Sequence, residues 1–352
     1  NSSKLKHLPL SDEAVKLARK RGFSGLSGFV NGVLRSIARE WKTVGFPNAS
    51  VCYSVPEWIV NTWQKDYGKE RTTQILEALS TEAKLTVRTN LQKCTPQELK
   101  KRLEEEGVTV TEVPEIPYAF ALSGLDYLSG LESFRDGWFY VQDVSSMMVA
   151  VTADPKPGNY VIDVCAAPGG KSTHMAELLD GTGMVEARDL TEYKVGLIEE
   201  NIMRTGLHNI KAVQMDATVL DEASIEKADV LVCDLPCSGL GVLGKKTDLK
   251  YKASPEGIVR KTDIRYKMTE EKAHELAQLQ QKILETVCAY VKPGGTMVYS
   301  TCTIHREENE ENVETFLQKH TDFSLVSEKQ MYPGEVGSDG FFLAKMVRSM
   351  HG

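Results

Sequence analysis

The stretch Asp163-Val-Cys-Ala-Ala-Pro-Gly-Gly-Lys-Ser-Thr173 decides the fold of this chain. The apolar run Tyr160-Val-Ile162 precedes it, and His174-Met-Ala-Glu-Leu-Leu179 follows it. A β-rich run that breaks at Pro-Gly-Gly and resumes with helical spacing predicts a strand, a tight loop and a helix. Gly169 and Gly170 can adopt backbone angles closed to other residues, and the first N–H groups of the helix favour an anionic group. The stretch therefore predicts a ligand-binding turn.

A carboxylate ends the next apolar run, Val185-Glu-Ala-Arg-Asp189. Nucleotide-binding α/β folds place the acid that holds a ribose hydroxyl about twenty residues after the glycine turn. The G-x-G-x-x-G spacing of dinucleotide sites is missing. The turn and Asp189 together favour an adenosine-containing ligand, and a plain strand-to-helix connection is the alternative.

The composition is that of a globular protein with two or three domains: 352 residues, 41% hydrophobic, 26% charged, net charge −7. No apolar run reaches the roughly 18 residues that span a bilayer, and no signal peptide opens the chain. The 7 cysteines form an odd set without paired C-x-x-C spacing, which argues against a disulfide framework and a zinc site. We expect a cytoplasmic protein without a bound metal or membrane contact.

The patterning changes twice along the chain, which predicts three domains. Residues 1–48 carry apolar positions at helical spacing over 11–22 and 29–37, too short a segment to bury a core of its own. Residues 49–136 predict a small α+β module with helices over 56–63, 72–79 and 95–103 and strands over 85–89 and 108–113.

Residues 137–352 alternate apolar strands with amphipathic helices, which predicts an α/β fold with a mostly parallel sheet covered on both faces. The expected strands are 160–164, 184–187, 210–213, 228–233, 296–299, 323–326 and 341–346. The last two are expected to form a closing hairpin. A basic segment, Lys245–Ser254, recurs as Arg260–Thr269, which indicates a duplicated surface loop; a nucleic-acid track and a merely solvated face both fit its charge.

Ligands and catalytic groups of an open α/β sheet collect at the carboxyl ends of its strands. Besides 163–171 and Asp189, these ends carry Asp216, Cys233-Asp-Leu-Pro-Cys-Ser-Gly239 and Tyr299-Ser-Thr-Cys302. Carbon 5 of cytosine is a poor nucleophile until a thiolate adds to carbon 6, and it can then attack the sulfonium methyl of S-adenosylmethionine. Two thiols and an acid beside an adenosine site fit that reaction on a base that has been unstacked.

Three segments resemble the signature motifs of the Nol1/Nop2/Sun family of RNA 5-methylcytosine methyltransferases. They are Cys165-Ala-Ala-Pro-Gly-Gly-Lys171, Asp234-Leu-Pro-Cys-Ser-Gly-Leu-Gly241 and Ser300-Thr-Cys-Thr-Ile-His-Arg-Glu-Glu-Asn-Glu310. Gln142–Ser146 and Asp339–Lys345 are similar to the family's entry motif and closing strand. The resemblance implies a class I S-adenosylmethionine-dependent methyltransferase with a Rossmann-like, seven-stranded sheet. A bacterial member of the family that acts on 16S ribosomal RNA carries a NusB-like helical domain. Phe29–Arg35 is similar to the end of that domain, so we expect a chain truncated at its amino end.

The resemblance also implies a role for each matching residue. Cys302 matches the attacking nucleophile, Cys237 the cysteine that assists product release, and Asp234 the acid poised between base and methyl donor. Cofactor binding falls to Cys165, Ala166, Ala167, Pro168, Gly169, Gly170 and Lys171 along the methionine part, Asp189 at the ribose, Asp216 beside the adenine, and Asp234. Arg188 departs from the family, which more often has a small or apolar residue there.

The expected function is methyl transfer from S-adenosylmethionine to carbon 5 of a cytosine in RNA, with 16S ribosomal RNA as the expected substrate of a monomeric enzyme. Transfer RNA or another RNA is an alternative substrate. A DNA cytosine methyltransferase, in which Cys237 would attack, and a non-catalytic RNA-binding factor are the alternatives of other classes.

Overall fold

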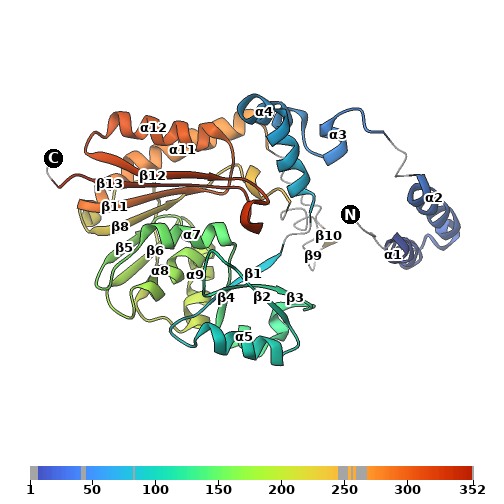
Figure 1. Ribbon diagram of the computed structural model, residues 1–352, viewed down its shortest axis with the longest axis horizontal. Helices are drawn as coiled ribbons and strands as arrows, with labels where there is room; N and C mark the ends of the chain where they lie inside the picture. The colour runs from blue at the N-terminus through green and yellow to red at the C-terminus, as the bar shows by residue number, and fades with distance from the viewer. Residues whose placement is uncertain are drawn as a thin grey trace. The chain divides into compact units, whose positions relative to one another are not determined.

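The computed structural model describes residues 7–40, 45–81, 84–244, 253–254, 257–258 and 268–350. The chain divides into two compact units, Asn1–Ser54 and Val55–Gly352. Of the duplicated basic segment, only the short strand β9 (Ala253–Ser254) and Met268 and Thr269 are described, and the strand β10 (Gly257–Ile258) lies between the two copies. The larger unit carries a four-stranded and a seven-stranded sheet, which organise the rest of the fold (Figure 1).

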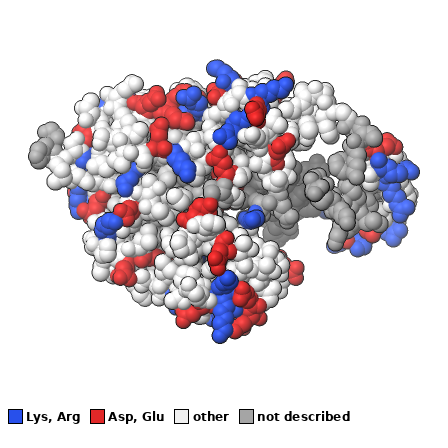
Figure 2. All heavy atoms as spheres, in the orientation of Figure 1, with Lys and Arg blue, Asp and Glu red and all other residues white. Residues whose placement is uncertain are grey.

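The first unit is helical. Its elements are α1 (His7–Lys20), η1 (Ser24–Leu26), α2 (Ser27–Glu40) and α3 (Ala49–Tyr53). The helices predicted over 11–22 and 29–37 are thus confirmed within a few residues. Leu17, Phe23 and Phe29 are 56%, 58% and 70% exposed, so the described part of this unit leaves large apolar side chains uncovered, as its short length predicted. Lys and Arg side chains gather on its surface (Figure 2).

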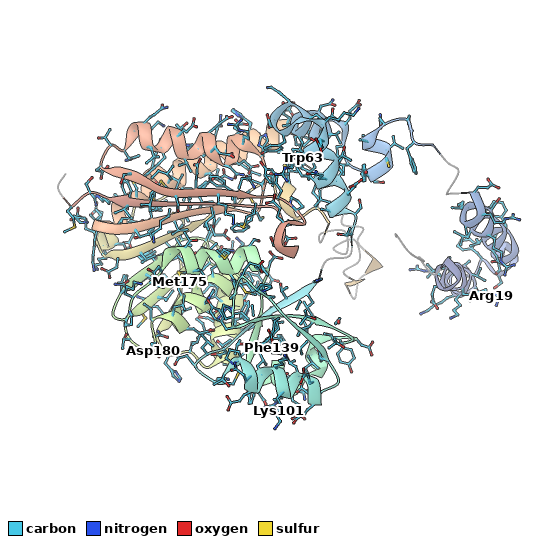
Figure 3. All side chains as sticks on the ribbon, viewed as in Figure 1. Arg19, Trp63, Lys101, Phe139, Met175 and Asp180 are labelled. Carbon is cyan, nitrogen blue, oxygen red and sulfur yellow. The ribbon has the colours of Figure 1, made fainter. Side chains whose placement is uncertain are left out.

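Helix α4 (Glu57–Leu79) opens the second unit and is broken at Gly68, where φ is 78° and ψ is 165°. Such angles suit only glycine, so the break separates the two helices predicted over 56–63 and 72–79. Trp63 is fully buried on the first half of the helix (Figure 3). Tyr67 donates a hydrogen bond of 2.5 Å to the carbonyl oxygen of Ile304.

The four-stranded sheet is antiparallel with the order β2-β3-β1-β4. Its strands are β1 (Leu85–Thr89), β2 (Thr109–Glu112), β3 (Ala119–Ser123) and β4 (Phe139–Val141). Helix α5 (Pro96–Glu105) begins with a capping box: the Thr95 side chain accepts from Glu98 N, and the Glu98 side chain accepts from Thr95 N. Two short elements, η3 (Leu128–Gly130) and α6 (Glu132–Arg135), precede β4. The sequence predicted β1 and β2 but not β3 or β4.

The seven-stranded sheet has the order β12-β13-β11-β8-β5-β6-β7. Its strands are β5 (Tyr160–Asp163), β6 (Met184–Asp189), β7 (Ile210–Gln214), β8 (Ala228–Asp234), β11 (Val291–Thr301), β12 (Phe323–Met331) and β13 (Phe341–Arg348). Every pair is parallel except those that β13 makes with β11 and β12. The predicted fold and its closing hairpin are confirmed. The strand order reverses between β5 and β8, where such sheets bind ligands.

Helices cover both faces of this sheet (Figure 1). They are α7 (Val144–Ala153), α8 (Gly170–Leu178) and α9 (Glu192–Thr205) on one face, and α11 (Glu270–Val287) and α12 (Glu310–Lys319) on the other. Met175 of α8 packs in one apolar cluster and Phe316 of α12 in the other. Short helices η4 (Glu222–Ser224), η5 (Leu240–Val242), η7 (Cys288–Tyr290), η8 (Arg306–Glu308) and η9 (Glu335–Gly337) lie in the connections. None of the described helices is long and apolar enough to cross a bilayer.

Candidate functional site

The glycine turn between β5 and α8 has the predicted form. Gly169 has a φ of 102° and caps α8, a conformation that disfavours any residue with a side chain. Ala166 N donates to the carbonyl oxygen of Arg188 at 2.8 Å, and Ala167 N donates to Asp189 Oδ2 at 3.0 Å. The turn is therefore hydrogen-bonded to the end of β6, and it lies beside the acid that the sequence singled out.

Asp189 is buried at the carboxyl end of β6. Its Oδ1 accepts from Leu190 N at 2.8 Å and from Lys194 Nζ at 2.9 Å, whereas within the described part of the chain its Oδ2 accepts only from Ala167 N. A carboxylate has about four lone-pair sites. Oδ2 therefore keeps acceptor capacity, as a ligand for a ribose hydroxyl requires.

Asp216 follows β7 at the same edge of the sheet, because Met215 N donates to the carbonyl oxygen of Asp189 at 2.9 Å. Thr218 donates to Asp216 Oδ1 through its backbone N and its hydroxyl, each at 2.8 Å, and these bonds hold the pKa of the Asp216 carboxyl below its usual value. The turn, Asp189 and Asp216 thus lie along one strand edge, and their donor set fits the adenosyl group of S-adenosylmethionine.

Arg188 is the residue that departs from the family pattern, and its side chain is directed toward Glu186 and Asp221. Its guanidinium is bound by Glu186 Oε1 at 2.5 Å and by Asp221 Oδ2 at 3.2 Å, and it lies 5.3 Å from the Tyr290 ring centre. Ser224 Oγ is a further partner at 2.5 Å. Arg188 therefore fastens the 221–224 turn to β6, and only its backbone touches the glycine turn.

The two predicted cysteines lie in contact. Asp234 of β8 and Ser300 of β11 are register partners, and Leu235 N donates to the carbonyl oxygen of Ser300 at 3.1 Å. The loops that leave these strands therefore start side by side. Cys237 Sγ lies 3.2 Å from Cys302 Sγ, which is a hydrogen-bonding contact and far longer than the roughly 2.05 Å of a disulfide bond. That hydrogen bond, together with burial, holds the pKa of the Cys237 thiol well above its usual value.

A lysine joins the acid of this site. Lys171 Nζ lies 2.7 Å from Asp234 Oδ2, and Ser300 Oγ donates to Asp234 Oδ1 at 2.8 Å. Burial lowers the pKa of Lys171, but the attraction of Asp234 outweighs it and leaves the pKa above its usual value. The sequence placed Lys171 only in the cofactor loop. The pair places a cation on the carboxylate that ends β8, at the start of the loop that carries Cys237.

Glu308, which has no predicted role, hydrogen-bonds to Ser238 in the Cys237 loop, and Ser238 in turn contacts Thr303 in the Cys302 loop. Glu308 is fully buried, and its carboxylate accepts from Ser238 N at 2.9 Å and from Gln280 Nε2 at 3.0 Å. Its only signal in the sequence is its place inside the segment 300–310. Ser238 and Glu308 are 70 positions apart, so no local pattern pairs them.

The other cysteines and histidines have structural surroundings. Cys233 is fully buried, and Cys165 is half-buried against the same apolar cluster; burial raises the pKa of both thiols. His174 is buried, and its Nε2 lies 2.9 Å from the Tyr118 hydroxyl. Within the described ranges, no three His, Cys, Asp or Glu side chains form a group that could hold a metal ion.

Comparison with known proteins agrees with this geometry. The family described as 16S rRNA methyltransferase RsmB/F matches residues 150–260 and 253–347, its ferredoxin-like domain matches 55–125, and the NusB family matches 9–39. The probable ribosomal RNA small subunit methyltransferase B of Bacillus subtilis is 38% identical, over 95% of this chain and 76% of that protein.

Two solved structures share the fold. The crystal structure of PH0851 has a TM-score of 0.79 and 27% identity and covers 98% of this chain and 78% of that one. NSun6 from Pyrococcus horikoshii with SFG, an analogue of S-adenosylmethionine, has a TM-score of 0.73 and 24% identity, over 84% of this chain and 99% of that one. The chain belongs to the RsmB/F family of 16S rRNA methyltransferases, and it is an S-adenosylmethionine-dependent RNA methyltransferase.

Proposed function

We propose that this protein methylates carbon 5 of a cytosine in 16S ribosomal RNA through a covalent bond between Cys302 and the base. The observation that carries the proposal is the 3.2 Å contact between Cys302 Sγ and Cys237 Sγ, next to the Lys171–Asp234 pair. A thiol that donates a hydrogen bond to a second thiol can stabilise that second sulfur as a thiolate. This arrangement favours the formation and cleavage of a carbon–sulfur bond over a purely structural role.

The two thiols take different roles. The raised pKa of Cys237 keeps its proton in place, and a Cys237 S–H that points to Cys302 Sγ stabilises negative charge on that sulfur. The Cys302 thiolate then adds to carbon 6 of cytosine. After methylation a water molecule takes the proton from carbon 5, the electron pair of that carbon–hydrogen bond restores the double bond between carbons 5 and 6, and the pair of the breaking carbon–sulfur bond returns to Cys302. Cys237 is the group assigned to assist this release, because its S–H can donate a hydrogen bond to the departing sulfur.

Asp234 and Lys171 stabilise the charge that develops on the base. Addition of a thiolate at carbon 6 places negative charge on the ring, and the Lys171 cation, held at 2.7 Å from Asp234, can stabilise that charge. Residues 165–171, Asp189 and Asp216 would hold S-adenosylmethionine, which supplies the electrophilic methyl group.

The wider assignments are proposals as well. We assign 1–48 to a NusB-like remnant, 49–136 to a small RNA-binding-like module and 137–352 to the catalytic domain. The match of 9–39 to the NusB family and of 55–125 to the ferredoxin-like domain supports this division. The 16S RNA substrate is supported by the family description and by the name of the Bacillus relative. A monomeric state and a cytoplasmic location remain predictions.

The proposal is tested with wild type, Cys302→Ala and Cys237→Ala on small-subunit RNA, transfer RNA and duplex DNA, with labelled methyl groups and mapping of 5-methylcytosine. We expect transfer to small-subunit RNA that Cys302→Ala abolishes. Loss of DNA methylation in Cys237→Ala alone would favour the DNA alternative. A wild-type protein that binds RNA but not S-adenosylmethionine would favour the non-catalytic alternative.

A further inference from the structure

We propose that Glu308 is the positioning residue that holds Cys237 and Cys302 in contact. This inference rests on the proposed function, because it concerns the two thiols to which that function assigns the chemistry. Glu308 hydrogen-bonds to residues beside the two cysteines. It acts through Ser238, the neighbour of Cys237, and through Thr303, the neighbour of Cys302.

The carboxylate of Glu308 accepts three hydrogen bonds, two from the Cys237 loop and one from α11. Oε1 accepts from Ser238 Oγ at 2.5 Å, and Oε2 accepts from Ser238 N at 2.9 Å and from Gln280 Nε2 at 3.0 Å. Glu308, Ser238 and Gln280 are all fully buried. A buried carboxylate needs such donors, so its position and that of Ser238 fix each other.

The proton order in this network can be derived. A carboxylate only accepts, so the single hydroxyl proton of Ser238 points to Glu308. Ser238 Oγ and Thr303 Oγ1 are 2.9 Å apart, so the hydroxyl proton of Thr303 points to Ser238. Thr303 Oγ1 in turn accepts from His305 N at 3.2 Å. One directed chain therefore joins the residue after Cys302 to the residue after Cys237 and ends on Glu308.

A second arm holds the other side of the Cys237 loop. Gln280 Nε2 donates to the carbonyl oxygen of Pro236 at 2.8 Å as well as to Glu308. Pro236 precedes Cys237, so both neighbours of this cysteine are fixed by groups that meet at Glu308. His305 Nδ1, at 3.6 Å from Glu308 Oε1, is too far for a hydrogen bond and adds only an electrostatic contact.

The network distinguishes a geometric role from a role of charge. In Glu308→Gln the amide oxygen can accept from Ser238 N and Gln280, and the amide N–H can donate to Ser238 Oγ, whose own proton then turns to Thr303. Every link survives with the chain reversed. In Glu308→Ala the backbone N and the hydroxyl of Ser238 lose their acceptor and Gln280 Nε2 keeps only Pro236, so the Cys237 loop is no longer held in place against Cys302.

The rate of disulfide formation between Cys237 and Cys302 reports on the contact between the two thiols. This disulfide assay does not depend on methylation. An azo oxidant such as diamide takes two protons and two electrons from Cys237 and Cys302, which form one S–S bond while the oxidant becomes a hydrazine. We expect Glu308→Ala to slow this reaction about tenfold and to lower kcat on the order of 100-fold, with KM for RNA changed less than about threefold. Glu308→Gln should stay within about threefold of wild type in both assays.

Glu106→Ala is the matched control. Glu106 accepts from Ser133 N at 2.9 Å and from Ser133 Oγ at 2.5 Å, the same arrangement within the small module. Glu106→Ala should leave both the rate of disulfide formation and kcat unchanged. If Glu308→Ala does not fold, Ser238→Ala is used in its place. Ser238→Ala removes the hydrogen bond to Thr303 and should therefore slow disulfide formation between Cys237 and Cys302.

The outcomes are distinct. An unchanged rate of disulfide formation in a folded Glu308→Ala or Ser238→Ala variant overturns the inference, even if kcat falls. Equal defects in Glu308→Gln and Glu308→Ala overturn it too, because charge and not geometry would then be the cause. Slower disulfide formation in Glu308→Ala, together with near-normal disulfide formation and kcat in Glu308→Gln, supports the inference. The proposed function fails separately, by methylation that survives Cys302→Ala.

Discussion

Arg88→Met should destabilise the large unit strongly. Arg88 of β1 is fully buried and forms an ion pair with Glu177 of α8, which is itself 1% exposed. Arg88 also donates to Gln142 Oε1 at 2.9 Å and to Thr173 Oγ1 at 3.2 Å. The guanidinium thus joins the small sheet to the helix that starts at the glycine turn.

The magnitude follows from what the substitution leaves behind. Methionine fills similar space but leaves a buried carboxylate without its cation, which typically costs about 3–5 kcal/mol. A domain has only about 5–15 kcal/mol of stability, so this loss is a large share. Removal of both charges in Arg88→Met/Glu177→Gln should cost less than the sum of the single substitutions, because no buried charge remains unpaired.

The pH dependence gives an independent check. Burial raises the pKa of Glu177, and the Arg88 cation opposes this rise. In Arg88→Met the folded pKa should rise further above the unfolded value, so the folded state binds the extra proton and stability falls as pH increases between the two values. The defect should therefore be smaller at pH 5 than at pH 8.

Urea unfolding followed by near-ultraviolet circular dichroism, for wild type, both single variants and the double variant at each pH, measures these quantities. Titration with S-adenosylmethionine on the same samples reports whether the glycine turn moves, since Tyr140 of β4 also donates to the carbonyl oxygen of Pro168 at 3.2 Å. A cost below about 1 kcal/mol at pH 8, or strictly additive single variants, would refute the reasoning.

Three further outcomes are expected. Lys171→Met should lower kcat on the order of 100-fold, because Asp234 loses its cation; single-turnover methyl transfer measures this, and a rate within threefold of wild type would count against it. Cys237→Ala should accumulate an RNA adduct that survives denaturing electrophoresis, because attack continues while release stalls; an adduct no more abundant than in wild type would speak against that role. Burial raises the pKa of Asp163 from 3.8 to about 7, so its folded form binds a proton across this window and stability falls as pH rises through it. Asp163→Asn should flatten that slope in thermal unfolding, and an unaltered slope would contradict it.

The sheet and the strand ends could be predicted because local signals agree there. Apolar runs of strand length end in Asp163, Asp189 and Cys233-Asp234, and parallel strands bring such ends to one edge. Strand β3 was missed because Ala119-Phe-Ala-Leu-Ser123 lacks apolar and polar alternation. Its pairing with β1 and β2 compensates for the weak local pattern.

The supporting contacts of the site could not be predicted, because they join distant parts of the chain. Lys171 reaches Asp234 only because β5 and β8 are neighbours, and Glu308 reaches Ser238 only through the loops that follow β8 and β11. Arg188 shows the same limit. Its position in the sequence suggested the cofactor turn, whereas alternation along β6 directs its side chain to Glu186 and Asp221.

The covalent bond at Cys302 is tested most directly with RNA in which the target cytosine carries fluorine at carbon 5. Fluorine cannot leave as a proton does, so the adduct persists after methyl transfer. Digestion and mass spectrometry then identify the residue that carries the nucleotide. We predict a single modified peptide with the methylated fluorocytosine on Cys302; a nucleotide on Cys237, or no adduct during active turnover, would contradict the proposed mechanism.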